Sequence, residues 1–230
     1  MAVLENIPTA AEPIRAVAFD LDGLMFNTED IFELMGVELL RRRGKALTDE
    51  LRVAMMGRRA HEAFAVMIEM LELSETVDAL RDESSLIFHS HFEAHLAPMP
   101  GLFELLAQIE LRHIPKAVAT SSHREYLDDL LGRFNLRERF HVTLAAEDVT
   151  HGKPHPEIYL KTAERLGVDP RAMLVLEDSQ AGTQAAAAAG AVAVAVPSRH
   201  SSGHDFAPAK FLAERLDDRR ILALLGESDP

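Results

Sequence analysis

Two aspartates one residue apart, Asp20 and Asp22, follow a short apolar run at Ala16–Phe19 in the segment RAVAFDLDGLMFNTE. An apolar run of this length is typical of a strand that is buried on both faces. Carboxylates at the end of such a strand are costly unless something binds them, and ligands bind at the carboxyl ends of strands in open α/β sheets. The pair is therefore a candidate catalytic or metal-binding site, and a plain turn with Gly23 is the alternative.

A cluster of hydroxyl residues, Thr120, Ser121 and Ser122, follows the strand predicted at Lys116–Thr120. Hydroxyl and backbone N–H groups that open a helix after a strand can bind an anion. The alternative is an ordinary N-cap, which Ser and Thr favour, and one residue can fill both roles.

A single lysine, Lys153, lies in the proline-stiffened segment HGKPHPEIYL. A stiff loop could present its ammonium group to a phosphoryl oxygen or a carboxylate, and a solvated surface lysine is the alternative. The Gly152-Lys153 pair is not a P-loop, because the spaced upstream glycine and the following Ser or Thr are missing.

A second acidic pair, Glu177 and Asp178, follows the strand predicted at Met173–Leu176 in LEDSQAG. These acids could simply complement the N-terminus of the next helix. If they meet Asp20 and Asp22 at one edge of a sheet, however, four carboxylates repel one another and require a cation. Hard oxygen ligands with room for water and a phosphate suit Mg²⁺.

The remaining sequence predicts an α/β fold with a helical insert. Apolar residues recur with helical spacing between Thr28 and Pro98, whereas strands and helices alternate after Pro98, which is typical of a parallel sheet covered on both faces. We expect a Rossmann-like core at residues 15–27 and 98–230 and an all-helical insert at residues 28–97. The predicted helices are Glu29–Arg43, His61–Leu73, Val77–Leu96, Leu102–Leu111, Arg124–Phe134, Pro156–Leu166 and Gln180–Ala189, and the predicted strands are Ala16–Phe19, Lys116–Thr120, Val142–Ala145, Met173–Leu176 and Val192–Val196, with a short strand and a helix within Phe211–Leu225.

The composition of the 230 residues, 47% hydrophobic and 27% charged, is that of a soluble globular enzyme. A net charge of −13 argues against a nucleic-acid polymer or an anionic membrane as the main partner, although local cations still permit a small phosphorylated substrate. The chain contains no cysteine and therefore no thiol chemistry. Without a signal peptide or a membrane-length apolar run, we expect a cytoplasmic protein.

Taken in order, DLDGLMFNTE, VATSS, GKPHPEIY and LEDSQAG closely resemble the motifs of the haloacid dehalogenase-like superfamily. The resemblance covers about residues 16–196 and is to the phosphatase and β-phosphoglucomutase branch, which carries a helical cap between the first two motifs. It implies a Mg²⁺-dependent phosphatase of a small phosphorylated metabolite, such as a sugar phosphate or nucleotide monophosphate. The stretch MGRRAHEAFAVMIEMLEL is also similar to pseudouridine-monophosphate phosphatases.

By position, the resemblance makes Asp20 the nucleophile that forms an aspartyl-phosphate and Asp22 the general acid and base. It assigns phosphate binding to the hydroxyl of Thr120, the backbone N–H of Ser121 and the charge of Lys153. A carboxylate can accept a phosphoryl group and so divide a difficult step in two.

The resemblance also implies the Mg²⁺ ligands: Asp20, the backbone carbonyl of Asp22, and Asp178, with Glu177 as a direct or outer-shell ligand. Charge neutralisation by such a cation is what phosphoryl transfer requires.

The insert is expected to select the substrate, acting as a lid. Within it, Arg58 or Arg59 could contact a second anionic group, and solvated surface arginines are the alternative. His91 and His95 have the i, i+4 spacing of zinc helices but no third ligand at a fitting distance. Other histidines show no such pattern and are expected at the surface; these are His89, His151, His155, His200 and His204.

Four positions separate this chain from branches of the superfamily. Asn27 replaces the usual Asp, and Phe32 stands where β-phosphoglucomutases carry a histidine, which weakens the alternative of a sugar-phosphate mutase. Haloacid dehalogenases lack an equivalent of Asp22. A phosphonatase would need a Schiff-base lysine in the cap, where Lys45 is the only lysine and its spacing from the first motif is short.

Overall fold

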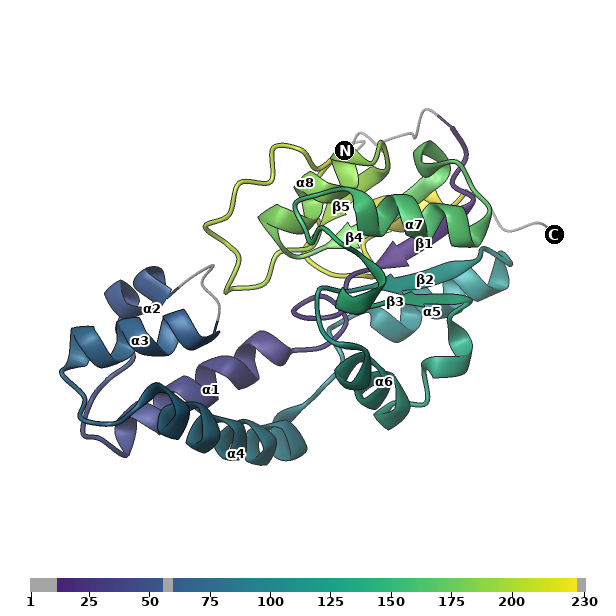
Figure 1. The fold of residues 1–230 in the computed structure, drawn as a ribbon. Coiled ribbons are helices and arrows are strands. Elements are labelled where there is room, and N and C mark those ends of the chain that lie inside the picture. The colour runs from purple at the N-terminus through teal and green to yellow at the C-terminus, as the bar shows by residue number, and fades with distance from the viewer. Residues whose placement is uncertain (1–11, 56–59, 227–230) are drawn as a thin grey trace, which may run out of the picture. The chain divides into compact units, whose positions relative to one another are not determined.

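The computed structural model describes residues 12–55 and 60–226, which form two compact units (Figure 1). One unit comprises the chain up to Phe26 and from Pro98 onward, and the other comprises Asn27–Ala97. Over the described ranges, no helix combines the length and the apolar character needed to cross a membrane.

The first unit is built on a parallel sheet of five strands in the order β3-β2-β1-β4-β5. Residue Phe19 at the end of β1 is in register with Val118 of β2 and Leu176 of β4. The residues that follow these strands therefore leave the sheet at the same edge. The strands are β1 (Ala16–Phe19), β2 (Lys116–Ala119), β3 (Val142–Leu144), β4 (Met173–Glu177) and β5 (Val192–Ala195).

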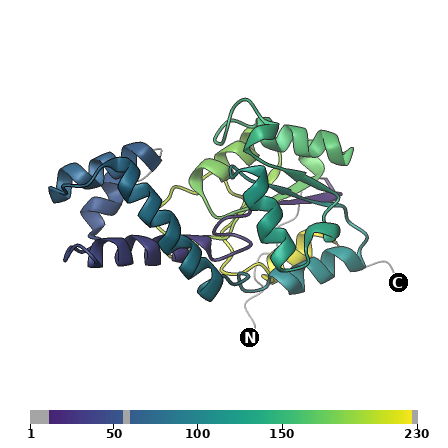
Figure 2. The same cartoon turned by 60° about the horizontal axis from the view of Figure 1, so that its bottom comes forward.

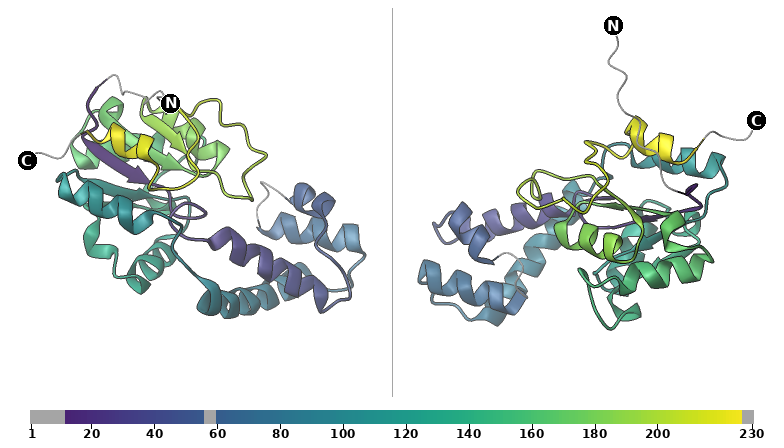
Figure 3. Two further views of the ribbon diagram at one scale, coloured as in Figure 1. Left: turned by 180° about the vertical axis from the view of Figure 1, so that it is seen from behind. Right: turned by 90° about the horizontal axis from the view of Figure 1, so that it is seen from above.

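Helices cover both faces of this sheet, which confirms the predicted Rossmann-like α/β class (Figure 3). Helices α7 and α8 pack on one face, and α5 and α9 lie on the other. On the first face, Ala16 and Ala18 of β1 join Ala185 and Ala186 of α8 in one buried cluster, because small side chains let helix and sheet approach closely. The helices are α5 (Leu102–Leu111), α6 (Arg124–Arg133), α7 (Glu157–Leu166), α8 (Gln180–Ala188) and α9 (Arg219–Leu224), with short 3₁₀ turns η1 (Arg137–Arg139), η2 (Ala146–Asp148) and η3 (Pro170–Ala172).

The second unit is helical in its described residues, with α1 and α4 packed against each other (Figure 2). Arg43, just after α1, pairs with Glu75 at 2.7 Å and with Glu83 at 2.5 Å, and so ties the end of α1 to α4. The helices are α1 (Thr28–Arg41), α2 (Asp49–Met55), α3 (Ala60–Leu71) and α4 (Val77–His95), and the buried core consists of Leu39, Leu40, Leu51, Phe64, Met67, Leu80 and Ile87.

Asn27 joins the two segments by which the chain enters and leaves this unit. Its side-chain amide donates to the carbonyl of His95 at 3.1 Å and its amide oxygen accepts from the N–H of Ala97 at 2.7 Å. An ionised aspartate can accept but cannot donate. Asparagine at this position therefore gains a hydrogen bond that the aspartate usual at this position could not make.

Two sequence-based expectations for secondary structure were wrong. Helix α2 was not predicted, because its seven residues are too few to show a helical period. The strand expected in the tail after Phe211 is reduced to a single bridge between Leu212 and Ala195. Whether such a segment forms a strand depends on its pairing with a neighbouring strand, and the local sequence does not encode that pairing.

Candidate functional site

Lys153 places its ammonium group between two buried carboxyl groups at the carboxyl edge of the sheet. Its Nζ lies 2.5 Å from Oδ1 of Asp20 and 2.6 Å from Oε1 of Glu177, and it donates to the carbonyl of Ala119 at 3.0 Å. Each of the three ammonium protons thus has an acceptor. Because only 6% of its side chain is exposed, the alternative of a solvated surface lysine is wrong.

Burial dominates the ionisation of this cluster. It raises the pKa of Asp20 to about 8, although the Lys153 ammonium lowers it, and the carboxylates of Glu177 and Asp22 raise it further. Burial alone would lower the pKa of Lys153, but the carboxylates of Asp20 and Glu177 hold it well above its usual value. Burial thus opposes the ionisation of Asp20, and a nearby positive charge favours it.

Glu177 is fully buried, and both of its carboxyl oxygens are held by protein donors. Oε1 accepts from Lys153 and from the hydroxyl of Tyr159 at 2.5 Å, while Oε2 accepts from Oγ of Ser179 at 3.0 Å. Beneath it lies Gly182 of α8, where an added Cβ would fall closer than 3.0 Å to the carboxyl group. These contacts make Glu177 the support that positions Lys153.

Three buried acids at this edge fit a divalent cation. Asp20, Glu177 and Asp178 each offer one oxygen, and these oxygens lie within 4.8 Å of one another. Carboxylate oxygens of this kind are the ligands that Mg²⁺ prefers. The Lys153 ammonium contacts two of the three carboxyl groups, those of Asp20 and Glu177, so the residues present fit such a cation by both charge and donor type.

Asp22 is held by hydroxyl groups from the segment after β2. Ser122 Oγ donates to its Oδ2 at 2.6 Å, Tyr126 donates to its Oδ1 at 3.2 Å, and Thr120 Oγ1 lies 3.4 Å from Oδ2. Ser121 is exposed on the same loop. Sequence reasoning missed Tyr126 as a site residue, and its only local signal was a phenol one helical turn beyond the hydroxyl cluster.

None of these hydroxyls caps helix α6. The cap position is His123, whose side chain makes no capping bond, and the N–H of Arg124 instead donates to the carboxylate of Glu147 at 3.0 Å. The N-cap interpretation of the Thr120–Ser122 cluster is therefore wrong. Because another residue satisfies the helix end, the hydroxyls remain available to Asp22.

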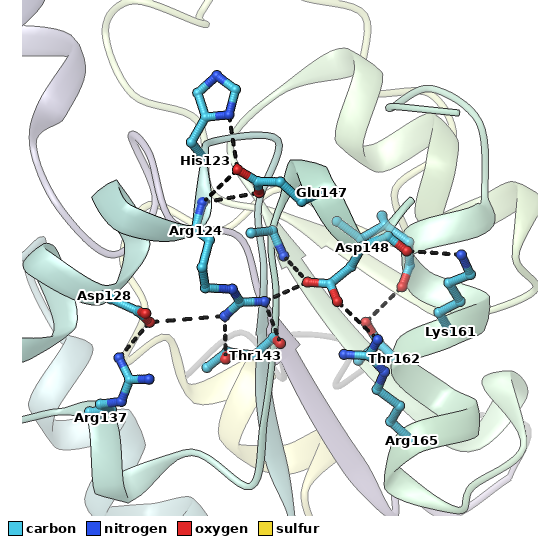
Figure 4. Close-up of polar contacts among 12 residues, drawn as sticks. His123, Arg124, Asp128, Arg137, Thr143, Glu147, Asp148, Lys161, Thr162 and Arg165 are labelled. Carbon is cyan, nitrogen blue, oxygen red and sulfur yellow. Dashed lines mark hydrogen bonds and ion pairs between the residues drawn. The ribbon is translucent and has the colours of Figure 1, made fainter. Parts of the chain in front are cut away.

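An ion-pair network fixes the loop that carries Lys153 (Figure 4). Arg124 at the start of α6 donates to Oδ2 of Asp148 at 2.5 Å, and Arg165 of α7 donates to Oδ1 of Asp148 at 2.9 Å. Asp148 ends the 3₁₀ turn before the loop. Asp148 thus links the start of α6, which follows the hydroxyl cluster Thr120–Ser122, to the loop that carries Lys153.

The same loop brings together His151, His155 and Glu157, which sequence spacing had not suggested. Potential ligand atoms of the three lie within 4.8 Å of one another. The Glu157 carboxylate, however, accepts from the ammonium of Lys161 at 2.7 Å and from two backbone N–H groups of the loop, and these hydrogen bonds lower its pKa. Its oxygens already serve to close the loop.

Two further groups from the sequence analysis can be placed as follows. Arg58 and Arg59 lie outside the described residues. The rings of His91 and His95 stack with centroids 5.6 Å apart, but across the described parts of the chain they join no group of three potential metal ligands.

Known proteins are similar to this chain in sequence and in fold. A sequence profile of the haloacid dehalogenase-like hydrolases matches residues 17–196. The chain is 32% identical to a phosphorylated carbohydrates phosphatase of Thermotoga maritima, over 77% of this chain and 82% of that protein. It is 31% identical to a fructose-1-phosphate phosphatase of Escherichia coli, over 80% and 97%. A HAD family hydrolase of Deinococcus radiodurans, solved with bound phosphate and sodium, superposes with a TM-score of 0.78 at 27% identity, over 93% of this chain and 98% of that chain.

Proposed function

The chain belongs to the haloacid dehalogenase-like hydrolases, and we propose that it is a Mg²⁺-dependent phosphatase of small phosphorylated metabolites. The observation that carries this proposal is the pairing of Asp20 with Lys153 beside Glu177 and Asp178. It combines a carboxylate that can attack phosphorus with a fixed positive charge and a set of cation ligands. Such positioning and charge neutralisation are what phosphoryl transfer requires.

In the first half-reaction, an oxygen of Asp20 attacks the phosphorus and forms an aspartyl-phosphate. The bond between phosphorus and the ester oxygen breaks, and its electron pair stays with that oxygen. Asp22 donates a proton to it, so the product leaves as a neutral alcohol. Lys153 holds the phosphoryl oxygens by charge, and Thr120 and the N–H of Ser121 hold them by hydrogen bonds.

In the second half-reaction, a water molecule attacks the phosphorus of the aspartyl-phosphate. The bond to Asp20 breaks and returns the free carboxylate, while the proton of the water passes to Asp22. Inorganic phosphate is released, and the proton that Asp22 gave up in the first half is restored. The net reaction is the hydrolysis of one phosphate ester by one water.

Asp20, the carbonyl of Asp22 and Asp178 would hold Mg²⁺, with Glu177 as a direct or outer-shell ligand that also holds Lys153. When bound, the cation supplies positive charge to the phosphoryl oxygens. A role for it is supported by the burial of Asp20, which raises the pKa of that carboxyl group, because a nearby cation favours the ionised form that attacks phosphorus.

The substrate class is inferred from the relatives, which are named as phosphatases of phosphorylated carbohydrates and of fructose 1-phosphate. We propose sugar phosphates and related small esters as substrates. That the helical unit selects among these substrates stays a prediction. The same holds for a contact of Arg58 or Arg59, both in the sequence of that unit, with a second anionic group of the substrate.

The test is release of inorganic phosphate from a panel of sugar phosphates, nucleotides and phosphoglycolate, with Mg²⁺ and with EDTA. We expect Mg²⁺-dependent release by the wild type and none by Asp20→Asn. The matched control is Asp129→Asn, which removes an exposed carboxylate that pairs with Arg133 along α6 and should leave the rate unchanged. Full activity of Asp20→Asn would refute the mechanism. Conversion of β-glucose 1-phosphate to the 6-phosphate with little free phosphate would replace the hydrolase by a mutase.

A further inference from the structure

Both oxygens of the Asp22 carboxylate accept hydrogen bonds from one short segment of the chain. Ser122 holds Oδ2 and Tyr126 holds Oδ1, at 2.6 Å and 3.2 Å. A carboxylate held at one oxygen can still turn about its Cβ–Cγ bond, whereas one held at both oxygens cannot turn without breaking a hydrogen bond. The two hydroxyls therefore define one orientation of the Asp22 side chain.

We propose that Ser122 and Tyr126 are positioning residues that hold Asp22 in the orientation from which it gives its proton to the leaving oxygen. This inference rests on the proposed function, in which Asp22 is the general acid. An acid contributes only when it lies within hydrogen-bond reach of the oxygen that it protonates. Asp22 is only partly buried and follows a strand end, so packing alone does not fix its side chain.

The two hydroxyls suit this role because the chain segment that carries them is anchored by contacts that do not involve Asp22. The N–H of Arg124, between Ser122 and Tyr126, is held by Glu147, and the guanidinium of Arg124 bonds Thr143 of β3 at 2.8 Å (Figure 4). The N-terminal turn of α6 is thereby attached to the sheet. This turn is therefore a rigid element against which the Asp22 carboxylate can be oriented.

The experiment measures kcat/KM of Ser122→Ala and Tyr126→Phe with a series of leaving groups at saturating Mg²⁺. The series runs from nitrophenyl phosphate, whose leaving group departs as an anion, through phenyl phosphate to an alkyl phosphate, whose oxygen must be protonated. This parameter reports the steps up to departure of the leaving group, before the hydrolysis step that all substrates share.

We expect each variant to lose about tenfold with the alkyl phosphate, as for the loss of one hydrogen bond, and little with nitrophenyl phosphate. Tyr159→Phe is the matched control, because it also removes one phenol hydroxyl from the site but acts on Glu177 and Lys153. Its loss should be the same for every leaving group.

An equal loss across the series in Ser122→Ala and Tyr126→Phe, or no loss, would overturn the positioning role and leave the phosphatase intact. A wild type that hydrolyses no ester in this series or in the panel of sugar phosphates, nucleotides and phosphoglycolate would instead overturn the proposed function, and this inference with it. The two failures are therefore distinguishable in one set of measurements.

Discussion

The substitution Gly182→Ala should displace the carboxyl group of Glu177 and so disturb its contact with Lys153. The Cβ of Gly182→Ala would lie closer than 3.0 Å to the carboxyl carbon and to both oxygens of Glu177. Non-bonded carbons require about 3.5–4.0 Å, so the carboxyl group must move by more than about half an ångström. Glu177 is fully buried and cannot turn into solvent, so it must leave at least one of its hydrogen-bond donors.

The cost can be worked from these contacts. Overpacking a buried site costs about 1–3 kcal/mol, and losing a hydrogen bond to a charged group costs about 1.5–3 kcal/mol. We expect a loss of about 3–5 kcal/mol in the free energy of unfolding, measured by urea denaturation. Phosphatase activity should fall with it, because Glu177 supports Lys153.

Gly132 provides the matched control, since it is also a helical glycine but has no atom within 4 Å of an added Cβ. Gly132→Ala should stabilise the protein by about 0.5–1 kcal/mol through reduced chain entropy. In a Glu177→Ala background, which removes the clashing group, Gly182→Ala should cost little. A wild-type unfolding midpoint for Gly182→Ala, or an equal loss in Gly132→Ala, would refute the reasoning.

Two further predictions concern acid stability and the metal. Hydrogen bonds from Arg139, and next from Lys116, lower the pKa of Glu110 from 4.5 to about 2, so its stabilising effect is present above pH 4.5 and is lost as the pH falls toward 2. Because Lys116 is buried, Glu110→Gln should cost about 1–2 kcal/mol at neutral pH, and urea denaturation should show the difference from wild type vanish near pH 2; a difference independent of pH would contradict this. Asp178→Asn should raise the Mg²⁺ concentration for half-maximal phosphate release by about tenfold or more, and an unchanged midpoint would remove Asp178 from the ligand set.

Local sequence was sufficient to predict the five strands of the sheet and the residues at their ends. The apolar runs before Asp20 and Glu177 are buried strands, and parallel register brings their ends to one edge of the sheet. Strand burial depends on side-chain type over a few consecutive residues, which a single sequence displays directly. The α/β class and the edge position of the two acidic pairs therefore follow from the order of residues along the chain.

Which way each polar side chain points was decided by the tertiary structure alone. Sequence reasoning did not predict that Glu177 also accepts hydrogen bonds from Lys153 and Tyr159, and its N-cap alternative for Thr120–Ser122 is replaced in the structure by the Glu147 carboxylate. These contacts join residues that are far apart in the chain but adjacent across the sheet. Their partners are set by strand order and helix crossovers, and residue spacing carries no information about either.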